Sequence, residues 1–164
     1  KVGFNGIWNS PARSRMIEVF EKDLAVGVEQ ERRILKQIKS KYPKAYKIEG
    51  YYKEWDIFIP EKNFGVEVKY DKKSQETGNI VIEVEFDGKP SALQTTKAEY
   101  WIIFDGKDDV WIKPNRIEDC IIQNGLRYAE FTGRGDRHSK KAFLIKKEVL
   151  YPYADKIITN SLQS

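Results

Sequence analysis

Residues 55–70 have the sequence WDIFIPEKNFGVEVKY, two β-rich runs separated by turn-forming residues. The first run is mostly apolar, the residues PEKN supply the turn, and the second run alternates between apolar and polar side chains. We therefore predict a β-hairpin that carries Asp56 in its first strand and Glu67 and Lys69 in its second strand.

The alternation places charged side chains together on this hairpin. Because successive side chains of a strand point to opposite faces, Glu67 and Lys69 share one face, and Asp56 brings a second carboxylate beside them. Desolvated charges are costly unless they are paired, bound to metal or functional. Two carboxylates and a lysine suit Mg²⁺ and a water that attacks phosphorus. The alternative is a solvent-exposed strand face with a weak ion pair.

A helical pattern precedes the hairpin between residues 23 and 42. One apolar stripe at helical spacing is formed by Leu24, Val28, Leu35, Ile38 and Tyr42. Glu31 occupies the missing position of that stripe, whereas its neighbours Arg32 and Arg33 lie off the stripe and are expected in solvent. A carboxylate in a buried stripe requires a positive partner. Glu31 is therefore the third candidate carboxylate, unless it lies at the edge of the stripe and bends out to water.

These features resemble the PD-(D/E)xK nuclease superfamily, which includes restriction endonucleases, Holliday-junction resolvases and phage exonucleases. The segment GVEQERRIL, residues 27–35, is similar to the first helix of archaeal junction resolvases, and the resemblance covers roughly residues 24–150. It implies that the family's acidic and basic positions correspond to Glu31, Asp56, Glu67 and Lys69. Trp55 stands where the family name has Pro, a departure that many members share.

The resemblance implies an α/β (α+β) fold with a restriction-endonuclease-like mixed central β-sheet flanked by helices. It also implies that Asp56, Glu67 and the Val68 carbonyl hold Mg²⁺ or Mn²⁺. Lys69 would orient or help deprotonate the attacking water, and Glu31 would position Lys69 or support a second cation through water.

The expected activity is metal-dependent hydrolysis of DNA phosphodiester bonds, directed by DNA structure or DNA ends. The main alternative is a non-catalytic nucleic-acid-binding module on the same fold. A third alternative, a structural protein with an accidental match, would bind no nucleic acid.

The next segment predicts a β–α–β unit. Residues 80–86 alternate, which predicts a third strand whose apolar face carries Ile80, Ile82, Val84 and Phe86. Glu83 and Glu85 take the other face, where they either add carboxylates to the cation site or point to solvent. Ser91 is placed to cap a following helix, and the apolar run at residues 100–104 is typical of a central strand buried on both faces.

Basic residues beyond the third strand are candidate DNA contacts. In the family that the chain resembles, the helix after this strand points toward the active site, which implies phosphate contact by Lys97. The densest basic segment is a predicted loop at residues 132–141, in which Gly and Ser allow close approach to a phosphate backbone. Its candidate contacts are Arg134, Arg137, His138, Lys140 and Lys141. The alternatives are that Lys97 is an ordinary surface lysine and that the loop contacts only solvent.

The remaining C-terminal segments predict smaller elements. Residues 110–113 predict a strand hairpinned to the preceding one, and residues 116–123 predict a short helix ended by Asn124-Gly125. Residues 126–131 and 142–150 predict a final pair of elements around the basic loop. The apolar side chains of the tail make a homodimer plausible: Tyr151, Tyr153, Ile157 and Ile158.

Composition limits the possible classes of protein. The 164 residues fit one domain, which we place at residues 23–164 after an N-terminal arm at residues 1–22. With 40% hydrophobic and 13% aromatic residues the chain is globular, and its net charge of +4 permits binding to DNA. The lone cysteine, Cys120, excludes a disulfide framework and indicates a reducing cytoplasm. No apolar run approaches the length of a membrane span, and the start shows no signal-peptide pattern.

Overall fold

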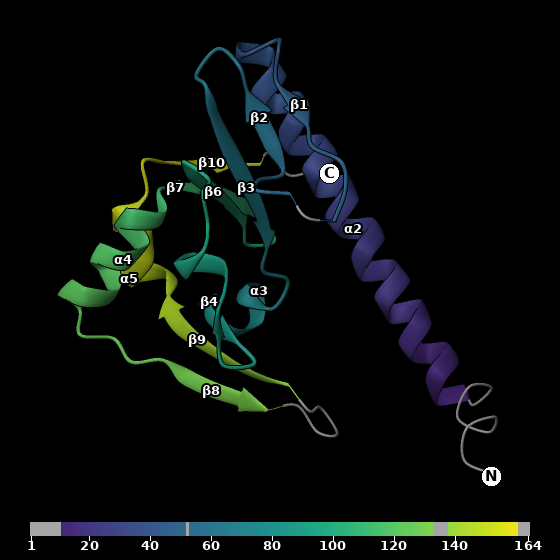
Figure 1. Ribbon diagram of the computed structural model, residues 1–164, viewed down its shortest axis with the longest axis vertical. Helices are drawn as coiled ribbons and strands as arrows, with labels where there is room; N and C mark the ends of the chain where they lie inside the picture. Colours follow the sequence, from purple (N-terminus) through teal and green to yellow (C-terminus); the bar gives the residue numbers. More distant parts are fainter. Residues whose placement is uncertain (1–10, 52, 133–137, 161–164) are drawn as a thin grey trace.

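The computed structural model describes residues 11–51, 53–132 and 138–160. These residues form a mixed α/β fold with two sheets, which confirms the predicted α+β class and its mixed sheet. The larger sheet has six strands in the order β1-β2-β3-β6-β7-β10, and the smaller one has four strands in the order β5-β4-β9-β8 (Figure 1).

In the six-stranded sheet, β3 and β6 are parallel and the other neighbours are antiparallel. Its strands are β1 (Tyr46–Lys47), β2 (Ile57–Ile59), β3 (Phe64–Tyr70), β6 (Tyr100–Phe104), β7 (Asp108–Ile112) and β10 (Lys156–Thr159). The smaller sheet is antiparallel and consists of β4 (Asn79–Phe86), β5 (Lys89–Pro90), β8 (Ala129–Thr132) and β9 (Ser139–Lys146). The pairing of β2 with β3 confirms the predicted hairpin.

The longest helix is α2 (Pro11–Lys41), which continues across the boundary expected at residue 22. Its C-terminal half lies along the six-stranded sheet, while its N-terminal half extends away from both sheets (Figure 1). The shorter helices are α3 (Ser74–Thr77), α4 (Pro114–Gln123) and α5 (Lys147–Leu150), and two 3₁₀ turns are η1 (Ala92–Gln94) and η2 (Tyr151–Tyr153).

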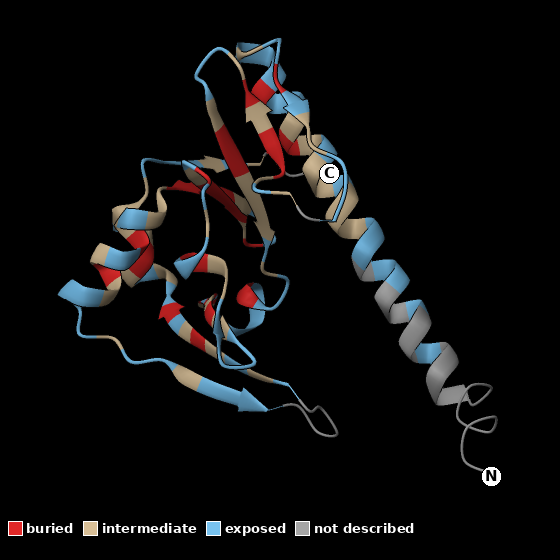
Figure 2. Ribbon diagram, viewed as in Figure 1, coloured by how far each residue is buried: buried red, intermediate tan, exposed pale blue. Residues whose placement is uncertain are grey.

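Burial on α2 differs from the predicted stripe. Ile34 and Ile38 are buried and pack against the six-stranded sheet, whereas Leu24 is 59% exposed. Among the positions of α2 that Figure 2 colours by burial, the buried ones are on the part that lies along this sheet. The predicted stripe is therefore wrong at Leu24, because that turn of the helix has no sheet beside it.

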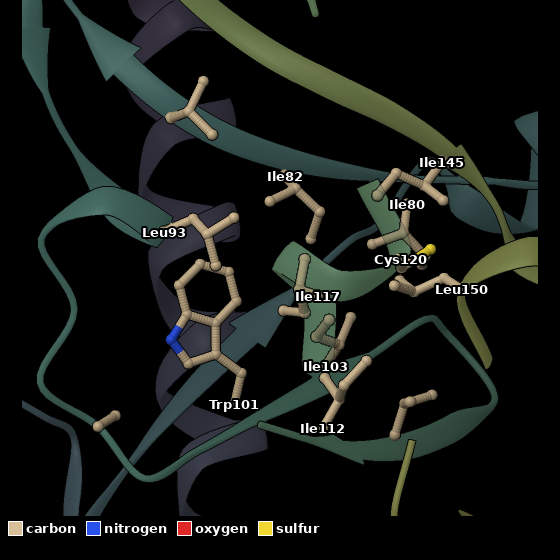
Figure 3. Packing of buried hydrophobic residues seen from close by; sticks show 13 residues of the cluster. Ile80, Ile82, Leu93, Trp101, Ile103, Ile112, Ile117, Cys120, Ile145 and Leu150 are labelled. Carbon is tan, nitrogen blue, oxygen red and sulfur yellow. The ribbon is translucent and has the colours of Figure 1, made fainter. Parts of the chain in front are cut away.

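Strand β6 is buried on both faces, as predicted. Ile102 packs with the residues of α2, β2 and β3, while Trp101 and Ile103 pack on the opposite side with the smaller sheet and α4. Figure 3 shows this second cluster, in which Leu93 lies beside Trp101. The six-stranded sheet is therefore covered by α2 on one face and mainly by the smaller sheet and α4 on the other.

The predicted β–α–β unit is wrong. Strand β4 belongs to the smaller sheet, and β6 pairs in parallel with β3 instead. The segment between β4 and β6 forms the short strand β5 and the 3₁₀ turn η1 in place of an α-helix, because its side chains bind β4. The Ser91 hydroxyl donates to Glu83 Oε1 (2.7 Å), and Gln94 Nε2 donates to the Val84 carbonyl (2.6 Å). Ser91 thus forms no helix cap.

The C-terminal segments differ from the predictions in two places. Lys140 and Lys141 lie within strand β9, not in a loop. The tail forms η2 and the edge strand β10, and the hydroxyl of Tyr151 donates to Asp105. These contacts use much of the tail surface that we expected to pack on a second subunit. Helix α4 ends at Gln123 as predicted and begins two residues earlier, at Pro114.

Candidate active site

The hairpin of β2 and β3 holds Asp56 against the middle of β3. Asp56 directly precedes β2 and is 8% exposed. Its backbone N–H donates to the Val66 carbonyl (3.0 Å), and its side-chain Oδ2 accepts a hydrogen bond from the Val68 N–H (2.7 Å). The carboxylate therefore lies beside the segment that carries Glu67 and Lys69.

Glu67 and Lys69 point to the same face of β3, as the alternation predicted. Lys69 Nζ lies 3.4 Å from Glu67 Oε1, and it also lies over the Trp101 ring, 4.9 Å from the centroid. The hydroxyl of Thr96 donates to Glu67 Oε2 (3.4 Å) and accepts from Trp101 Nε1 (3.0 Å). The segment after η1 and strand β6 thus fix the position of Glu67.

Glu67 and Lys69 open into a polar cleft of about 500 Å³. The cleft is lined by Lys53, Glu54, Glu67, Lys69, Val81, Glu83, Ala92, Thr95, Thr96, Lys97 and Trp101. Glu83 of β4, which the sequence placed either at the cation site or in solvent, lies on the face opposite the buried Ile82. Its carboxylate reaches the cleft because β4, in the second sheet, faces β3 across it.

Glu31 lies behind the hairpin and is paired. Its side chain is 19% exposed, with Lys47 Nζ at 3.1 Å from Oε2 and Lys53 Nζ at 4.0 Å from Oε1. Lys53 Nζ also lies 2.8 Å from Asp56 Oδ1, so one ammonium bridges two candidate carboxylates. Partial burial acts to lower the pKa of Lys53, but the hydrogen bond to Asp56 and the charges of Asp56, Glu31 and Glu49 raise it above its ordinary value. Lys53 is therefore a permanent cation at neutral pH.

Sequence reasoning missed Lys53. It lies in the loop before β2, where neither helical nor strand periodicity applies, and its only sequence signal is its position three residues before Asp56. A basic residue close to a candidate metal ligand was a detectable feature, but nothing indicated which carboxylates it would bind.

The side chains beside Asp56 offer few ligands for Mg²⁺. Within the described ranges, no three His, Cys, Asp or Glu side chains form a metal-binding group. Mg²⁺ needs only one or two carboxylates and keeps several waters, and Lys53 demonstrates that a cation is accommodated beside Asp56. Asp56 and Glu67 are the carboxylates available to such an ion, and both oxygens of Asp56 are engaged in this structure, Oδ1 by Lys53 and Oδ2 by the Val68 N–H. Val68 donates its amide N–H to Asp56 Oδ2, and the expected role of its carbonyl as a metal ligand stays a prediction.

Among the predicted DNA contacts, Lys97 reaches the cleft. Its side chain is 68% exposed, and Nζ lies 3.3 Å from Glu54 Oε1 at the rim. It follows the turn η1 and is not on the helix we expected. Arg134 and Arg137 lie outside the described residues.

The other predicted contacts lie on or beside β9 and do not line the cleft. Lys141 is paired with Glu85 (2.8 Å), and that hydrogen bond raises the pKa of Lys141. Lys140 lies over the Phe86 ring (5.7 Å to the centroid), and the ring of His138 stacks on Phe86 with centroids 5.3 Å apart. The structure thus separates the predicted basic set into a rim lysine and a group on the second sheet.

Comparison with known proteins adds no assignment. A scan against protein-family models, a search of curated proteins and a search of solved structures each found no match. No helix in the described part of the chain has the length and apolar character needed to cross a membrane.

Proposed function

We propose that this chain is a metal-dependent deoxyribonuclease with a restriction-endonuclease-like catalytic site. The observation that carries the proposal is the position of Asp56 on the middle of β3, beside the Glu67–Lys69 pair that opens into the cleft. Glu31 is held on the far side of Asp56 by the bridging Lys53. These are the four residues that the resemblance implied, and three separate elements contribute them.

The proposed roles follow from the charges. Mg²⁺ or Mn²⁺ held by Asp56 and Glu67 would supply Lewis-acid stabilisation of the charge that builds on phosphorus. Lys69 orients the attacking water and adds positive charge near the scissile phosphate. Thr96 keeps the Glu67 carboxylate in place, and Lys97 contacts a neighbouring phosphate at the rim.

DNA is the proposed partner, and cutting is directed by DNA structure or ends. A homodimer and a cytoplasmic location belong to the same proposal. The measured mass in solution tests the homodimer, and the buried, unpaired Cys120 supports the reducing compartment.

The second candidate is a non-catalytic nucleic-acid-binding module. One observation favours it: Lys53 already neutralises Asp56, so the carboxylates are compatible with a purely structural ion-pair network.

The test is cleavage of supercoiled plasmid and branched DNA, with Mg²⁺ or with EDTA. We expect Mg²⁺-dependent cutting by the wild type and its loss, by about a hundredfold or more, in Asp56→Ala and Lys69→Ala. DNA affinity in EDTA should survive or rise, because the reacting groups are not the main DNA contacts. Asp56→Asn preserves the shape of the side chain if the alanine variant unfolds.

Matched controls come from the same hairpin. Glu61 and Lys62 lie exposed in its turn, so Glu61→Ala and Lys62→Ala should cut at the wild-type rate. Retained cleavage in Asp56→Ala or Lys69→Ala contradicts the proposal. DNA binding by a wild type that cuts no substrate supports the second candidate.

A further inference from the structure

The outer face of the second sheet carries four exposed apolar side chains and a lysine. We define the outer face by Val81, Phe86, Phe131, Lys140 and Leu144. Cross-strand partners in an antiparallel sheet point to the same side, and the register pairs Val81 with Leu144 and pairs Lys140 with both Phe86 and Phe131. The four apolar members are 37–50% exposed.

A β-bulge creates this arrangement. Glu83 pairs with Ala142 and Phe86 pairs with Lys140, so the four residues 83–86 of β4 lie opposite the three residues 140–142 of β9. The extra residue reverses the alternation and turns Phe86 to the outer face, whereas the sequence predicted it beside the buried Ile82. The bulge therefore places an aromatic ring on the same face as Glu83.

The outer face continues into the candidate active site. Val81 and Glu83 belong to this face of β4 and also line the cleft. Phe86 follows Glu83 by three residues, roughly 10 Å along the strand. A chain that lies on the outer face can therefore reach the cleft without leaving the surface.

The chemistry of the outer face suits an unpaired nucleic-acid strand. Phe86 and the ring of His138 form a stack, and the His138 side chain is 54% exposed. Lys140 lies between Phe86 and Phe131 in register, and none of the described carboxylates pairs with it. Exposed rings beside an unpaired cation bind the bases and phosphates of single strands, whereas the bases of a duplex are already stacked on one another.

We propose that the outer face binds an unpaired DNA strand and leads it to the cleft. Bases stack on Phe86, His138 and Phe131, and Lys140 contacts the phosphate backbone. The proposal rests on the proposed nuclease function for the role of the cleft, and it specifies the substrate class as DNA with a single-stranded end, flap or branch.

The test is binding measured by fluorescence anisotropy in EDTA, with labelled oligothymidylate and a duplex of the same length. We expect the double variant Phe86→Ala/Phe131→Ala to bind oligothymidylate about tenfold more weakly or worse, with duplex affinity unchanged. The double variant Phe86→Tyr/Phe131→Tyr keeps the rings and should retain the affinity. Circular dichroism verifies folding, and Phe131→Ala alone carries the test if the double variant unfolds.

Tyr128→Ala is the matched control. Tyr128 is 53% exposed and directly precedes β8, but it faces the opposite side of the sheet, where it contacts Phe143 and Lys141. Its removal should leave oligothymidylate binding unchanged. Wild-type affinity in the double alanine variant, an equal loss in Tyr128→Ala, or an equal loss for duplex and single strand overturns the proposal.

The binding assay contains EDTA and no Mg²⁺, so it measures strand binding without cleavage. The outer-face proposal and the nuclease proposal can therefore be refuted independently. A wild type that binds oligothymidylate through the phenylalanines but cuts no DNA with Mg²⁺ refutes the nuclease and supports the outer face. A wild type that cuts DNA, with oligothymidylate binding independent of the phenylalanines, supports the nuclease and refutes the outer face.

Discussion

Lys53 joins carboxylates from two different elements, Glu31 of α2 and Asp56 before β2. In Lys53→Gln both carboxylates lose a positive partner in a partly buried place, so we expect the free energy of unfolding in EDTA to fall by about 1–2 kcal/mol. The same change removes the cation that competes for Asp56. Mg²⁺ should therefore bind more tightly and raise the melting temperature more than in the wild type.

Thermal unfolding with and without Mg²⁺ measures this effect. Lys47→Gln is the control, because the ammonium of Lys47 pairs with Glu31 and the ammonium of Lys53 is the one that pairs with Asp56. It should lower stability without increasing the response to Mg²⁺. An equal response to Mg²⁺ in Lys53→Gln and the wild type contradicts the prediction.

At single residues, the sequence predicted contacts within one element and missed those between distant elements. Alternation along β3 was enough to place Glu67 and Lys69 together. Arg33 was expected in solvent, yet its guanidinium binds both oxygens of the buried Asp109 (2.7 and 2.8 Å), 76 positions away. Helical periodicity compares positions on one helix only, so it cannot identify a partner on β7.

At the scale of elements, glycines on α2 and β3 have opposite environments. A Cβ at Gly27 meets no atom within 4 Å, whereas a Cβ at Gly65 overlaps the ring of Trp55. We expect Gly27→Ala to stabilise the protein by about 0.5–1 kcal/mol, because alanine loses less backbone entropy in a helix. Gly65→Ala should destabilise it by about 1–3 kcal/mol through overpacking.

Urea denaturation followed by circular dichroism measures both changes, and each variant is the other's control for the effect of an added methyl group. A destabilising Gly27→Ala would show that α2 is not a regular helix at that turn. A neutral Gly65→Ala would show that Trp55 does not pack on β3.

Elements with a strong local pattern could be predicted from the sequence. The segment after Ser91 could not, because a helix was expected there and the structure has only the 3₁₀ turn η1. Alternation defined β3 and β4, and a continuous apolar run defined β6. Ser91 is a good helix-capping residue, but its hydroxyl binds Glu83, and burial of Leu93 holds the segment against the second sheet. Tertiary contacts outweighed the local signal there, and no periodicity in the sequence reports such contacts.

At the scale of the whole molecule, the sequence predicted a mixed sheet but not the division into two sheets. The alternation in β4 fixed which side chains are buried, yet the same pattern suits a neighbour of β3 or a strand in another sheet. The partner of a strand depends on residues far away in the chain, here on β9. That division matters for function, because the proposed cleft lies where the two sheets meet.

Strand β6 links the two hydrophobic clusters. Ile102 is fully buried in the cluster with α2, and its neighbour Ile103 is 1% exposed in the cluster with the second sheet. We predict that Ile102→Ala and Ile103→Ala each lower the free energy of unfolding by about 2–5 kcal/mol, the usual effect of a cavity in a core. Because adjacent residues of one strand support both clusters, the protein should unfold in a single transition.

Urea unfolding followed by tryptophan fluorescence and by far-ultraviolet circular dichroism tests this prediction. Both signals should change together in the wild type and should shift by the same amount in each variant. Leu144→Ala, at a 46% exposed position on the outer face, should change stability by only about 0.5 kcal/mol. Separate transitions would mean that the two sheets fold independently, and the cleft between them would then lose its rigid support before the protein unfolds.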